Sequence, residues 1–463
     1  MSYTTIDDPT IYFNTILYSG DNTSNRNITG FGFQPDFLWH RGRNVSFNHY
    51  LFDSVRGNSS VLKSNSAVME DTSTTGFNGF ISDGFNVSQQ SGWEMNNSSL
   101  SVNYVNWCWS AGGSSPAITY SVKVVSDSGN KYRFDDFGSS AVTLDLQEGG
   151  TYTFDQSDSS NAGHPLRFST TSNGTHGGGS EYTTGVTTTG TPGSSGAYTR
   201  ITVAASAPTL YYYCTQHSGM GGQANTNSTF GSSNFGGSIQ STVSANTTAG
   251  LSIVSYTGTG SNATVGHGLG VAPKMVIIKH RSDTYDWVVY HKDAGNTGFL
   301  RLNTTNATDT GINMFQNTDP TSSVFSISTH GAVNDSSDNF IAYCFAEKQG
   351  YSKLGSYTGN GNADGTFVYT GFKPAFLIMK ASSATGNWFI FDNKRDGFNH
   401  QNDYLKANLS DAEVANERVD LLSNGFKFRT SNSGWNGSGT TYIYMAFAEN
   451  PFVNSNGIPT NAT

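Results

Sequence analysis

The sequence predicts an all-β protein, and three observations carry that prediction. Short aromatic and β-branched runs, such as MVII at 275–278 and FKFRT at 426–430, have the length and alternation of strands. Gly, Asn, Asp and Ser separate these runs, as expected for a chain with many turns. Aromatic residues make up 13% of the chain, which is too many for a disordered protein. One exception, DAEVANERVD at 411–420, is compatible with a short helix.

Three segments repeat the same landmarks, which predicts one β unit used three times. Each segment carries Gly-apolar-x-Pro before its first strong strand, and each closes on a strand of alternating aromatics. The proline and the closing aromatic lie at 35 and 109, at 273 and 345, and at 374 and 447. Such constant spacing is typical of internal repeats. In the closing strands we expect Trp107 and Trp109 to face the core, with Cys108 on the opposite face.

These landmarks divide the chain into five parts. We expect three β-sandwich-type repeats, a further sandwich inserted between repeats one and two, and a Gly/Ser/Asn/Thr-rich linker after that insertion. The predicted boundaries are 1–116 for repeat 1, 117–225 for the insertion, 226–248 for the linker, 249–350 for repeat 2, and 351–463 for repeat 3 with a C-terminal tail.

Composition and charge exclude several classes of function. The formal net charge is −9 and no Lys/Arg cluster occurs, so we expect no nucleic-acid partner. No apolar run reaches the roughly 18 residues of a membrane span, so we expect no membrane insertion. The N-terminal stretch has two Asp where a signal peptide needs basic residues, which predicts synthesis in a cytoplasm without export. No catalytic sequence pattern is present, and we nominate no catalytic residue.

Surface candidates for binding are few. Trp93 in SGWEM and Trp435 in SGWNG lie in polar stretches, so we nominate both as platforms for a sugar ring. Asp53 and Arg56, repeated at 392 and 395, are expected to close a turn as an exposed ion pair. NDSSDN at 334–339 offers oxygen ligands for Ca²⁺ but lacks the spacing of a calcium loop. His176, in a Gly-rich loop, is expected to be solvated.

The stretch YYYCTQHSGMGG at 211–222 combines metal-ligand side chains at close spacing. Cys214, His217 and Met220 form a Cys-x-x-His-x-x-Met pattern, and His164 in GHPL supplies a fourth donor upstream. Two His, one Cys and a weak axial Met make up the blue-copper ligand set. With the strands LDLQ and TYTF, this segment resembles a cupredoxin with amicyanin- or pseudoazurin-like spacing. The resemblance implies copper as a cofactor, held by these four residues. The alternative is a scaffold of the same fold without metal.

The repeats carry a second resemblance. The opening TIDDPTIYFNT, the body ITGFGFQPDFLW…LFDSVRG…SDGFNV…WCWSAGG and the ending TYIYMAFAENPFV are similar to virion structural and tail-fibre-like proteins of marine tailed phages, cyanophages among them. This resemblance implies a virion component whose partners are other virion proteins and a host surface glycan or receptor. It implies no enzymatic activity.

Three hypotheses of function follow. The first is a phage virion appendage or surface protein, of tail-fibre or capsid-decoration type, that contributes to host attachment as a homo-oligomer, with a homotrimer as one candidate symmetry. The second is a copper-binding redox module carried on β repeats. The third is an enzyme that degrades polysaccharide, for which distant strands would have to supply the carboxylates.

Overall fold

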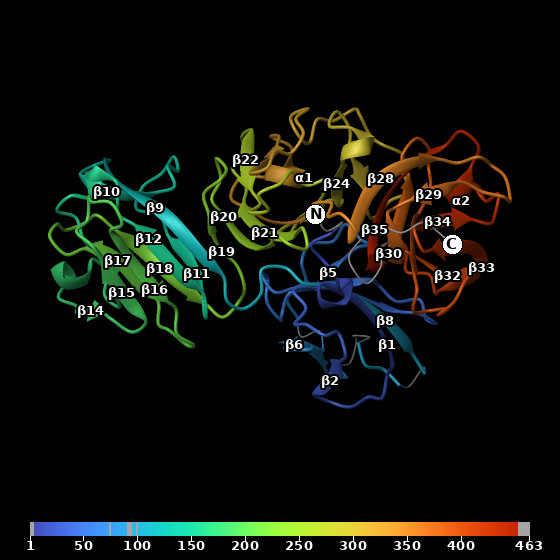
Figure 1. Ribbon diagram of the computed structural model, residues 1–463, viewed down its shortest axis with the longest axis horizontal. Helices are drawn as coiled ribbons and strands as arrows, with labels where there is room; N and C mark the ends of the chain where they lie inside the picture. The colour runs from blue at the N-terminus through green and yellow to red at the C-terminus, as the bar shows by residue number, and fades with distance from the viewer. Residues whose placement is uncertain (1–3, 74–75, 90–94, 99–100, 452–463) are drawn as a thin grey trace.

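The chain folds almost entirely into β-strands. The computed structural model describes residues 4–73, 76–89, 95–98 and 101–451. Strands dominate this part, and its α-helices, α1 (Gly331–Asn334) and α2 (Ser433–Asn436), are single turns. The prediction of an all-β protein is therefore confirmed. None of the helices described is long and apolar enough to cross a membrane. Figure 1 shows a smaller lobe, formed by β9 to β18, beside a larger body.

The body contains a main sheet from each of the three segments predicted to repeat. The first sheet has the order β1-β8-β3-β4-β5: β1 (Phe13–Ser19), β8 (Asn103–Trp109), β3 (Phe37–Gly42), β4 (Tyr50–Asp53) and β5 (Leu62–Lys63). The second has the order β19-β20-β21-β27-β23-β24-β25: β19 (Ser232–Asn234), β20 (Ser241–Asn246), β21 (Leu251–Thr257), β27 (Asn339–Phe345), β23 (Met275–His280), β24 (Val288–His291) and β25 (Leu300–Arg301). The third has the order β28-β35-β30-β31-β32-β33-β34-β29: β28 (Ser352–Thr358), β35 (Thr441–Pro451), β30 (Phe372–Ala381), β31 (Trp388–Asp392), β32 (Gln401–Lys406), β33 (Val414–Leu422), β34 (Gly425–Phe428) and β29 (Phe367–Tyr369).

Equivalent strands follow one another in the same order in all three sheets. The shared run is β1-β8-β3-β4-β5, β21-β27-β23-β24-β25 and β28-β35-β30-β31-β32, with antiparallel pairing throughout. In each case the residue two positions after the conserved proline pairs with the closing aromatic: Phe37 with Trp109, Met275 with Phe345, and Phe376 with Phe447. The strand order therefore agrees with the repeat that the landmark spacing predicts. Small sheets complete the first two units, formed by β2 (Arg26–Thr29), β7 (Gly84–Val87) and β6 (Phe77–Ile81), and by β22 (Ala263–Gly266) and β26 (Val324–Ile327).

One hydrophobic core is shared by the three units. Each closing strand turns its aromatic face into this core, which contains Trp107, Trp109, Tyr343, Phe345 and Phe447. The opposite face of each strand belongs to a separate, local core, where Cys108, Cys344 and Ala446 occupy equivalent places. The predicted orientation of Trp107, Trp109 and Cys108 is confirmed. The units are thus joined through their interiors.

Buried cations link the units in a cyclic order. Equivalent positions after the conserved prolines hold Arg41, Lys279 and Lys380, and all three residues are fully buried. Arg41 donates to the carbonyl oxygens of Ser410 (2.7 Å) and Asp411 in the third unit.

The two lysines repeat this contact. Lys279 Nζ donates to Ala67 O of the first unit (3.0 Å), and Lys380 Nζ donates to Thr305 O of the second (3.1 Å). Burial lowers the pKa of each lysine to about 8. Because unit one contacts three, two contacts one, and three contacts two, the contacts close a ring.

Two of the three junctions also contain buried ion networks. Arg56 contacts Asp53 (2.5 Å) and Glu70 (2.9 Å), and Glu70 also binds Arg281 of the second unit (2.8 Å). Tyr343 of the second unit donates to Asp53 (2.7 Å). The prediction of an exposed Asp53–Arg56 pair is therefore wrong, because a neighbouring unit covers the turn that the pair closes.

The equivalent network at the second junction uses Arg395, Asp392 and Glu413. Arg395 contacts Asp392 (2.6 Å) and Glu413 (2.8 Å), and Arg43 of the first unit binds Glu413 (2.7 Å). Trp107 Nε1 donates to Asp392 (3.0 Å), in the role that Tyr343 has at the other junction.

The third junction, between the second and third units, is built differently. His291 and Ala294 stand where the other units have Asp and Arg. His291 is buried, and its hydrogen bonds are those of a neutral imidazole. Nδ1 accepts from Asp293 N (3.2 Å) and Nε2 donates to Tyr444 O (3.3 Å). Burial lowers the pKa of His291 to about 4.

The inserted lobe is a sandwich of two five-stranded sheets. One has the order β10-β9-β12-β16-β15: β10 (Asn130–Phe134), β9 (Ala117–Ser126), β12 (Thr151–Asp155), β16 (Tyr198–Thr202) and β15 (Val186–Thr189). The other has the order β11-β18-β17-β13-β14: β11 (Leu144–Gln147), β18 (Gly222–Asn227), β17 (Leu210–Cys214), β13 (Leu166–Ser169) and β14 (Glu181–Tyr182). Each sheet has one parallel pair, β9 with β12 and β11 with β18. The two sheets enclose a core of their own.

Two local predictions from the sequence are wrong. The stretch 226–248 is not an unstructured linker, because β19 and β20 extend the second sheet by pairing onto β21. The stretch 411–420 does not form a helix. Its C-terminal part is in β33, where pairing with β34 buries Val419 and Leu421. In both stretches, pairing with a neighbouring strand determines the conformation. Local composition does not indicate that such a strand lies alongside.

Phe447→Ala tests the shared core. Phe447 is 2% exposed and packs against Phe13, Trp109 and Phe376. We expect a loss of about 3–5 kcal/mol in the free energy of unfolding, as for other buried Phe truncations. Urea unfolding should still show one transition for the whole body. A variant as stable as the wild type would contradict the assignment of Phe447 to the core.

The variant His291→Asn tests the third junction, because His291 should make the stability of the protein depend on pH. The folded protein binds this proton less readily than the unfolded chain, so His291 favours folding above its unfolded pKa of about 6.5. That contribution is lost as the pH falls toward about 4. Between pH 7 and pH 4 the wild type should lose roughly 3 kcal/mol more stability than the variant, measured by urea unfolding. The Asn side chain still has an oxygen that can accept from Asp293 N. Equal losses of stability in the variant and the wild type would refute the assignment of His291 as a buried, neutral group.

Candidate metal centre

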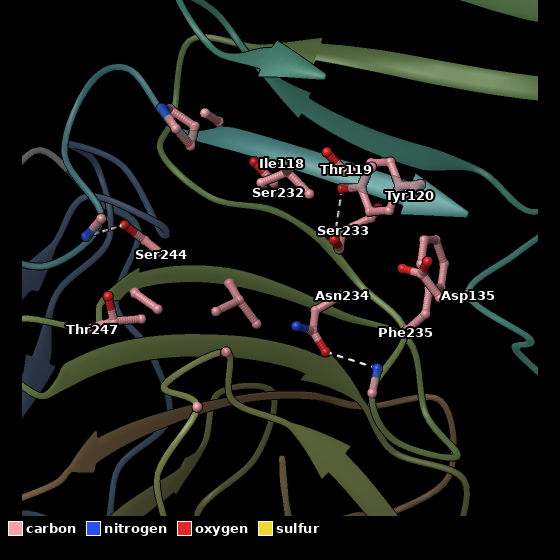
Figure 2. Close-up of a pocket in the computed structure, with 18 of the residues that line it drawn as sticks. Ile118, Thr119, Tyr120, Asp135, Ser232, Ser233, Asn234, Phe235, Ser244 and Thr247 are labelled. Carbon is pink, nitrogen blue, oxygen red and sulfur yellow. Dashed lines mark hydrogen bonds between the residues drawn. The ribbon is translucent and has the colours of Figure 1, made fainter. Parts of the chain in front are cut away.

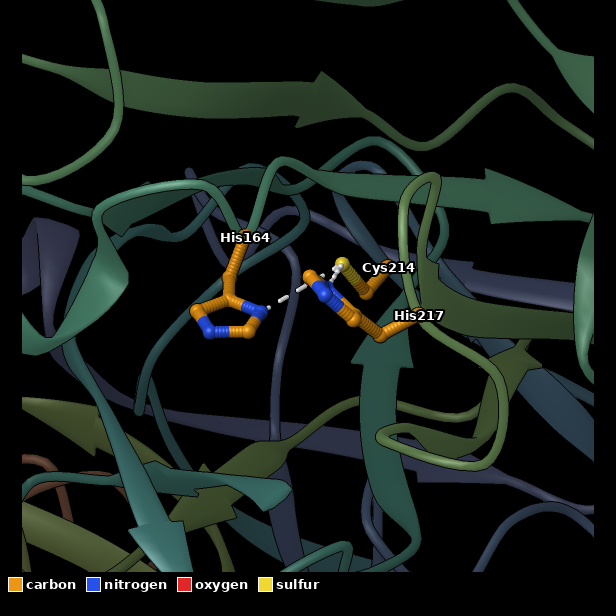
Figure 3. A group of neighbouring side chains, drawn as sticks. All are labelled: His164, Cys214 and His217. Atoms are coloured by element: carbon orange, nitrogen blue, oxygen red, sulfur yellow. Dashed lines mark hydrogen bonds between the residues drawn. The ribbon is translucent and has the colours of Figure 1, made fainter.

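The fold brings a histidine and a cysteine together from strands that are distant in sequence. Cys214 is the last residue of β17, and His164 precedes β13, which pairs with β17 so that Leu166 lies opposite Cys214. The chain then turns through His217 and Met220 before β18 begins at Gly222. His164 and the 214–220 loop therefore meet at one end of the sandwich, as Figure 3 shows.

The donor atoms converge on a common point. Cys214 Sγ lies 3.8 Å from His164 Nδ1 and 3.8 Å from His217 Nδ1. One ligand atom from each of the three residues lies within 4.8 Å of the others. The two imidazole rings have a centroid separation of 4.5 Å. Sulfur and nitrogen donors bound to one ion at about 2.3 and 2.0 Å, in a trigonal arrangement, would be separated by about 3.8 Å. The spacing is therefore short enough for the three donors to bind one ion.

The environment of the donors suits metal binding. Cys214 is fully buried, His164 is partly buried and His217 is exposed. Burial, and then the neighbouring His217, lowers the pKa of His164, which favours the neutral imidazole that binds metals. Met220 is 1% exposed and belongs to the same hydrophobic core as Cys214. The structure thus brings together the two His and the Cys, and it buries Met220 in the core that contains the Cys.

Hydrogen bonds from a separate loop hold the ligand loop in place. Asn173 precedes the 3₁₀ turn η3 (Gly174–Gly177), and its Oδ1 accepts from Gly219 N (2.8 Å) while its Nδ2 donates to Ser218 Oγ (2.8 Å). His176 is exposed, yet its Nε2 donates to Cys214 O (3.0 Å). The sequence analysis missed both roles, because contacts between two loops leave no periodic pattern. The Gly-rich composition around His176 was the one available signal.

Two further bonds fix the loop of His164. Tyr132 Oη donates to His164 O (2.9 Å), and Gln156 Nε2 donates to the same oxygen (2.8 Å). Gln156 also accepts from Leu166 N (3.1 Å). Side chains from other parts of the lobe therefore hold both ends of the candidate centre in place, and those at the His164 end, Tyr132 and Gln156, are buried.

Comparison with known proteins places the body in a family. The model of DUF7483, a domain of unknown function, matches residues 8–132 and 214–451. The chain belongs to the DUF7483 family. No curated protein and no solved structure matches the chain. The family match passes over 133–213, most of the inserted lobe, so that His164 lies outside the DUF7483 match whereas Cys214, His217 and Met220 lie within it.

The two tryptophans nominated as sugar platforms have different outcomes. Trp93 lies outside the described residues. Trp435 is 1% exposed in α2, where its ring packs edge-on against Phe389, Phe391 and Tyr404. The prediction that Trp435 forms a binding platform is wrong, because the short helix turns the ring into the local core of the third unit.

A second cluster near the NDSSDN stretch does not have the chemistry of a metal centre. His280, Asp335 and Asp338 have oxygen and nitrogen atoms within 4.8 Å of one another. However, His280 Nδ1 accepts from Ser282 N and Asp283 N, so the neutral ring carries its proton on Nε2. Nε2 lies 3.4 Å from Asp338 Oδ2, so its proton faces that carboxylate. The ring therefore presents a proton to the carboxylates, not a lone pair to an ion.

Proposed function

We propose that the inserted lobe is a cupredoxin-type module that binds one copper ion. The observation that carries this proposal is the convergence of two imidazole Nδ1 atoms on a buried thiol at 3.8 Å each. Two His, one Cys and a weak axial Met form the ligand set of blue-copper electron-transfer sites. Further support comes from the two-sheet sandwich around the centre and from the ligand pattern in the sequence.

Each of the four residues would have its own role in binding copper. Cys214 would bind as a thiolate, with its buried position keeping water away from the sulfur. His164 and His217 would bind through Nδ1, and Met220 would supply the weak fourth contact. A copper ion bound by these residues would supply one-electron transfer. His217 is exposed, so its ring gives a partner access to the centre.

Titration with Cu(II) tests the module. The wild type should bind one equivalent and develop the intense visible band of a thiolate–Cu(II) charge transfer. Cys214→Ser should abolish the band, and His164→Ala should weaken binding by at least about tenfold. Absorption spectroscopy and calorimetry on the purified full chain provide both measurements.

A matched cysteine variant controls for unspecific thiol chemistry. Cys344 is also buried, and the equivalent place in the third unit holds Ala446, so Cys344→Ala should fold normally and keep the full band. If the wild type stays colourless and calorimetry detects no tight copper binding, the lobe is a scaffold without metal and the proposal fails.

A second candidate function concerns the whole chain. We propose that it is a virion structural protein, an appendage or surface component that contributes to host attachment and assembles with other virion proteins and further copies of itself. The sequence resemblance to tail-fibre-like proteins of marine phages is the main support. The construction of the body adds to it, because units joined through a shared core form a rigid frame that displays the lobe at one side (Figure 1).

Localisation on particles tests this candidate. Antibody labelling of purified phage in the electron microscope should place the chain on the particle surface, and mass spectrometry of the same particles should detect it. Labelling with an antibody against the lobe should compete with adsorption to host cells. If purified particles lack the chain, the virion proposal is wrong, whatever the result of the copper titration.

A further inference from the structure

A second place in the molecule has the form of a binding site. A cavity of ≈ 740 Å³ opens where the lobe meets the body, away from the candidate metal centre. The first half of β9 forms one wall, β20 forms another, and the segment 232–236 crosses between them, as Figure 2 shows. Its volume lies within the ~300–1,000 Å³ of small-molecule sites, which often occur between domains.

The segment that crosses the cavity is held rigidly. Tyr120 Oη donates to Ser233 O (2.7 Å), and Tyr152 Oη shares a hydrogen bond with Ser232 Oγ (2.6 Å). Ser233 Oγ accepts from Asp145 N (2.8 Å), which ties the same segment to the lobe. The cavity is therefore a built feature of the joint and not a gap left by a loosely packed loop.

The lining favours an uncharged polar ligand. It is rich in hydroxyl groups and backbone, and the described residues around it include a carboxylate, Asp135, but no Lys, Arg or His. An anionic ligand would find no cation here and would be repelled by Asp135. Ile118 and Phe235 provide an apolar part of the wall. A ligand with many hydroxyl groups and one apolar face matches this combination.

Several polar groups of the lining are still able to bind a ligand. Asn234 uses Oδ1 to accept from Gly236 N (2.9 Å), whereas its amide nitrogen has no partner among the described residues. Serine and threonine side chains of the lining add hydroxyl groups. Asp135 uses Oδ1 to accept from Ser121 N (2.8 Å), which leaves its second oxygen available. A carboxylate oxygen, an amide N–H and a hydroxyl can together bind adjacent hydroxyl groups of a sugar.

We propose that this cavity binds a neutral oligosaccharide through Asp135 and Asn234. The biological role of this site rests on the proposed attachment function, in which the ligand would be a host surface glycan. The binding itself is a property of the purified chain. If the chain is not found on particles, the attachment role is refuted, whereas sugar binding by the purified chain can still be tested.

Ligand-observed NMR on the purified full chain tests the inference. The probes are neutral trisaccharides of glucose, galactose, mannose and N-acetylglucosamine, with sialyllactose as the anionic comparison. At least one neutral trisaccharide should show saturation transfer, and sialyllactose should show none. Asn234→Asp, which keeps an oxygen to accept from Gly236 N but removes the amide donor, should abolish the signal.

A pair of carboxylate variants makes the test specific. Asp135 (φ 48°) and Asp136 (φ 56°) both have left-handed backbone, which Asn also tolerates, so either can be replaced by Asn without strain. Asp135→Asn should weaken binding of the neutral trisaccharide at least about tenfold, because a charged acceptor is lost. Asp136→Asn, whose carboxylate binds Lys123 and is not part of the lining, should leave affinity unchanged.

The inference is overturned if no neutral trisaccharide binds the wild type. It is also overturned if binding persists unchanged in both Asn234→Asp and Asp135→Asn, which would place the ligand elsewhere, or if sialyllactose binds more tightly than the neutral sugars. Thermal unfolding of each variant, compared with the wild type, separates loss of binding from loss of fold.

Discussion

The architecture depends on a core that no single unit can complete. Each closing strand presents aromatic side chains on the face opposite its local core, and an isolated unit would leave that face in water. Joining three such faces buries all of them at once, which is the dominant favourable term in folding. The arrangement explains why the chain keeps the aromatic residues Trp109, Phe345 and Phe447 at matching places while much of the intervening sequence differs.

Hydrophobic burial alone would not set the order of the units, and polar contacts supply that information. The buried cations Arg41, Lys279 and Lys380 need acceptors, and the carbonyl oxygens of the next unit provide them only in one register. The Asp–Arg–Glu networks add charge pairing at two junctions. At the third, His291 uses a neutral ring to reach Tyr444 O. The ring is therefore asymmetric in its chemistry although its strand order repeats.

Much of this could be predicted from the sequence, and the limits have a physical cause. Landmark spacing indicated the repeated strand order, and the Cys-x-x-His-x-x-Met pattern with His164 indicated which side chains would meet. Periodicity reports which face of a strand is buried but not what covers it, so neither a core common to all three units nor the burial of the Asp53–Arg56 pair was foreseen. The same limit applies to Trp435 and to β19 and β20. The clamp of Asn173 and His176 on the ligand loop depends on contacts between distant loops, which no local pattern encodes.

The insertion has a consequence for how such a protein can change over time. The lobe leaves the body after β8 and returns at β19, its core contains side chains of its own sheets with Phe235 from the joint, and the DUF7483 match passes over most of it. The ring therefore folds around contacts in which the lobe takes almost no part. Replacing the lobe would leave the contacts of the ring in place, and because the joint cavity has walls from both, each replacement would also reshape that cavity.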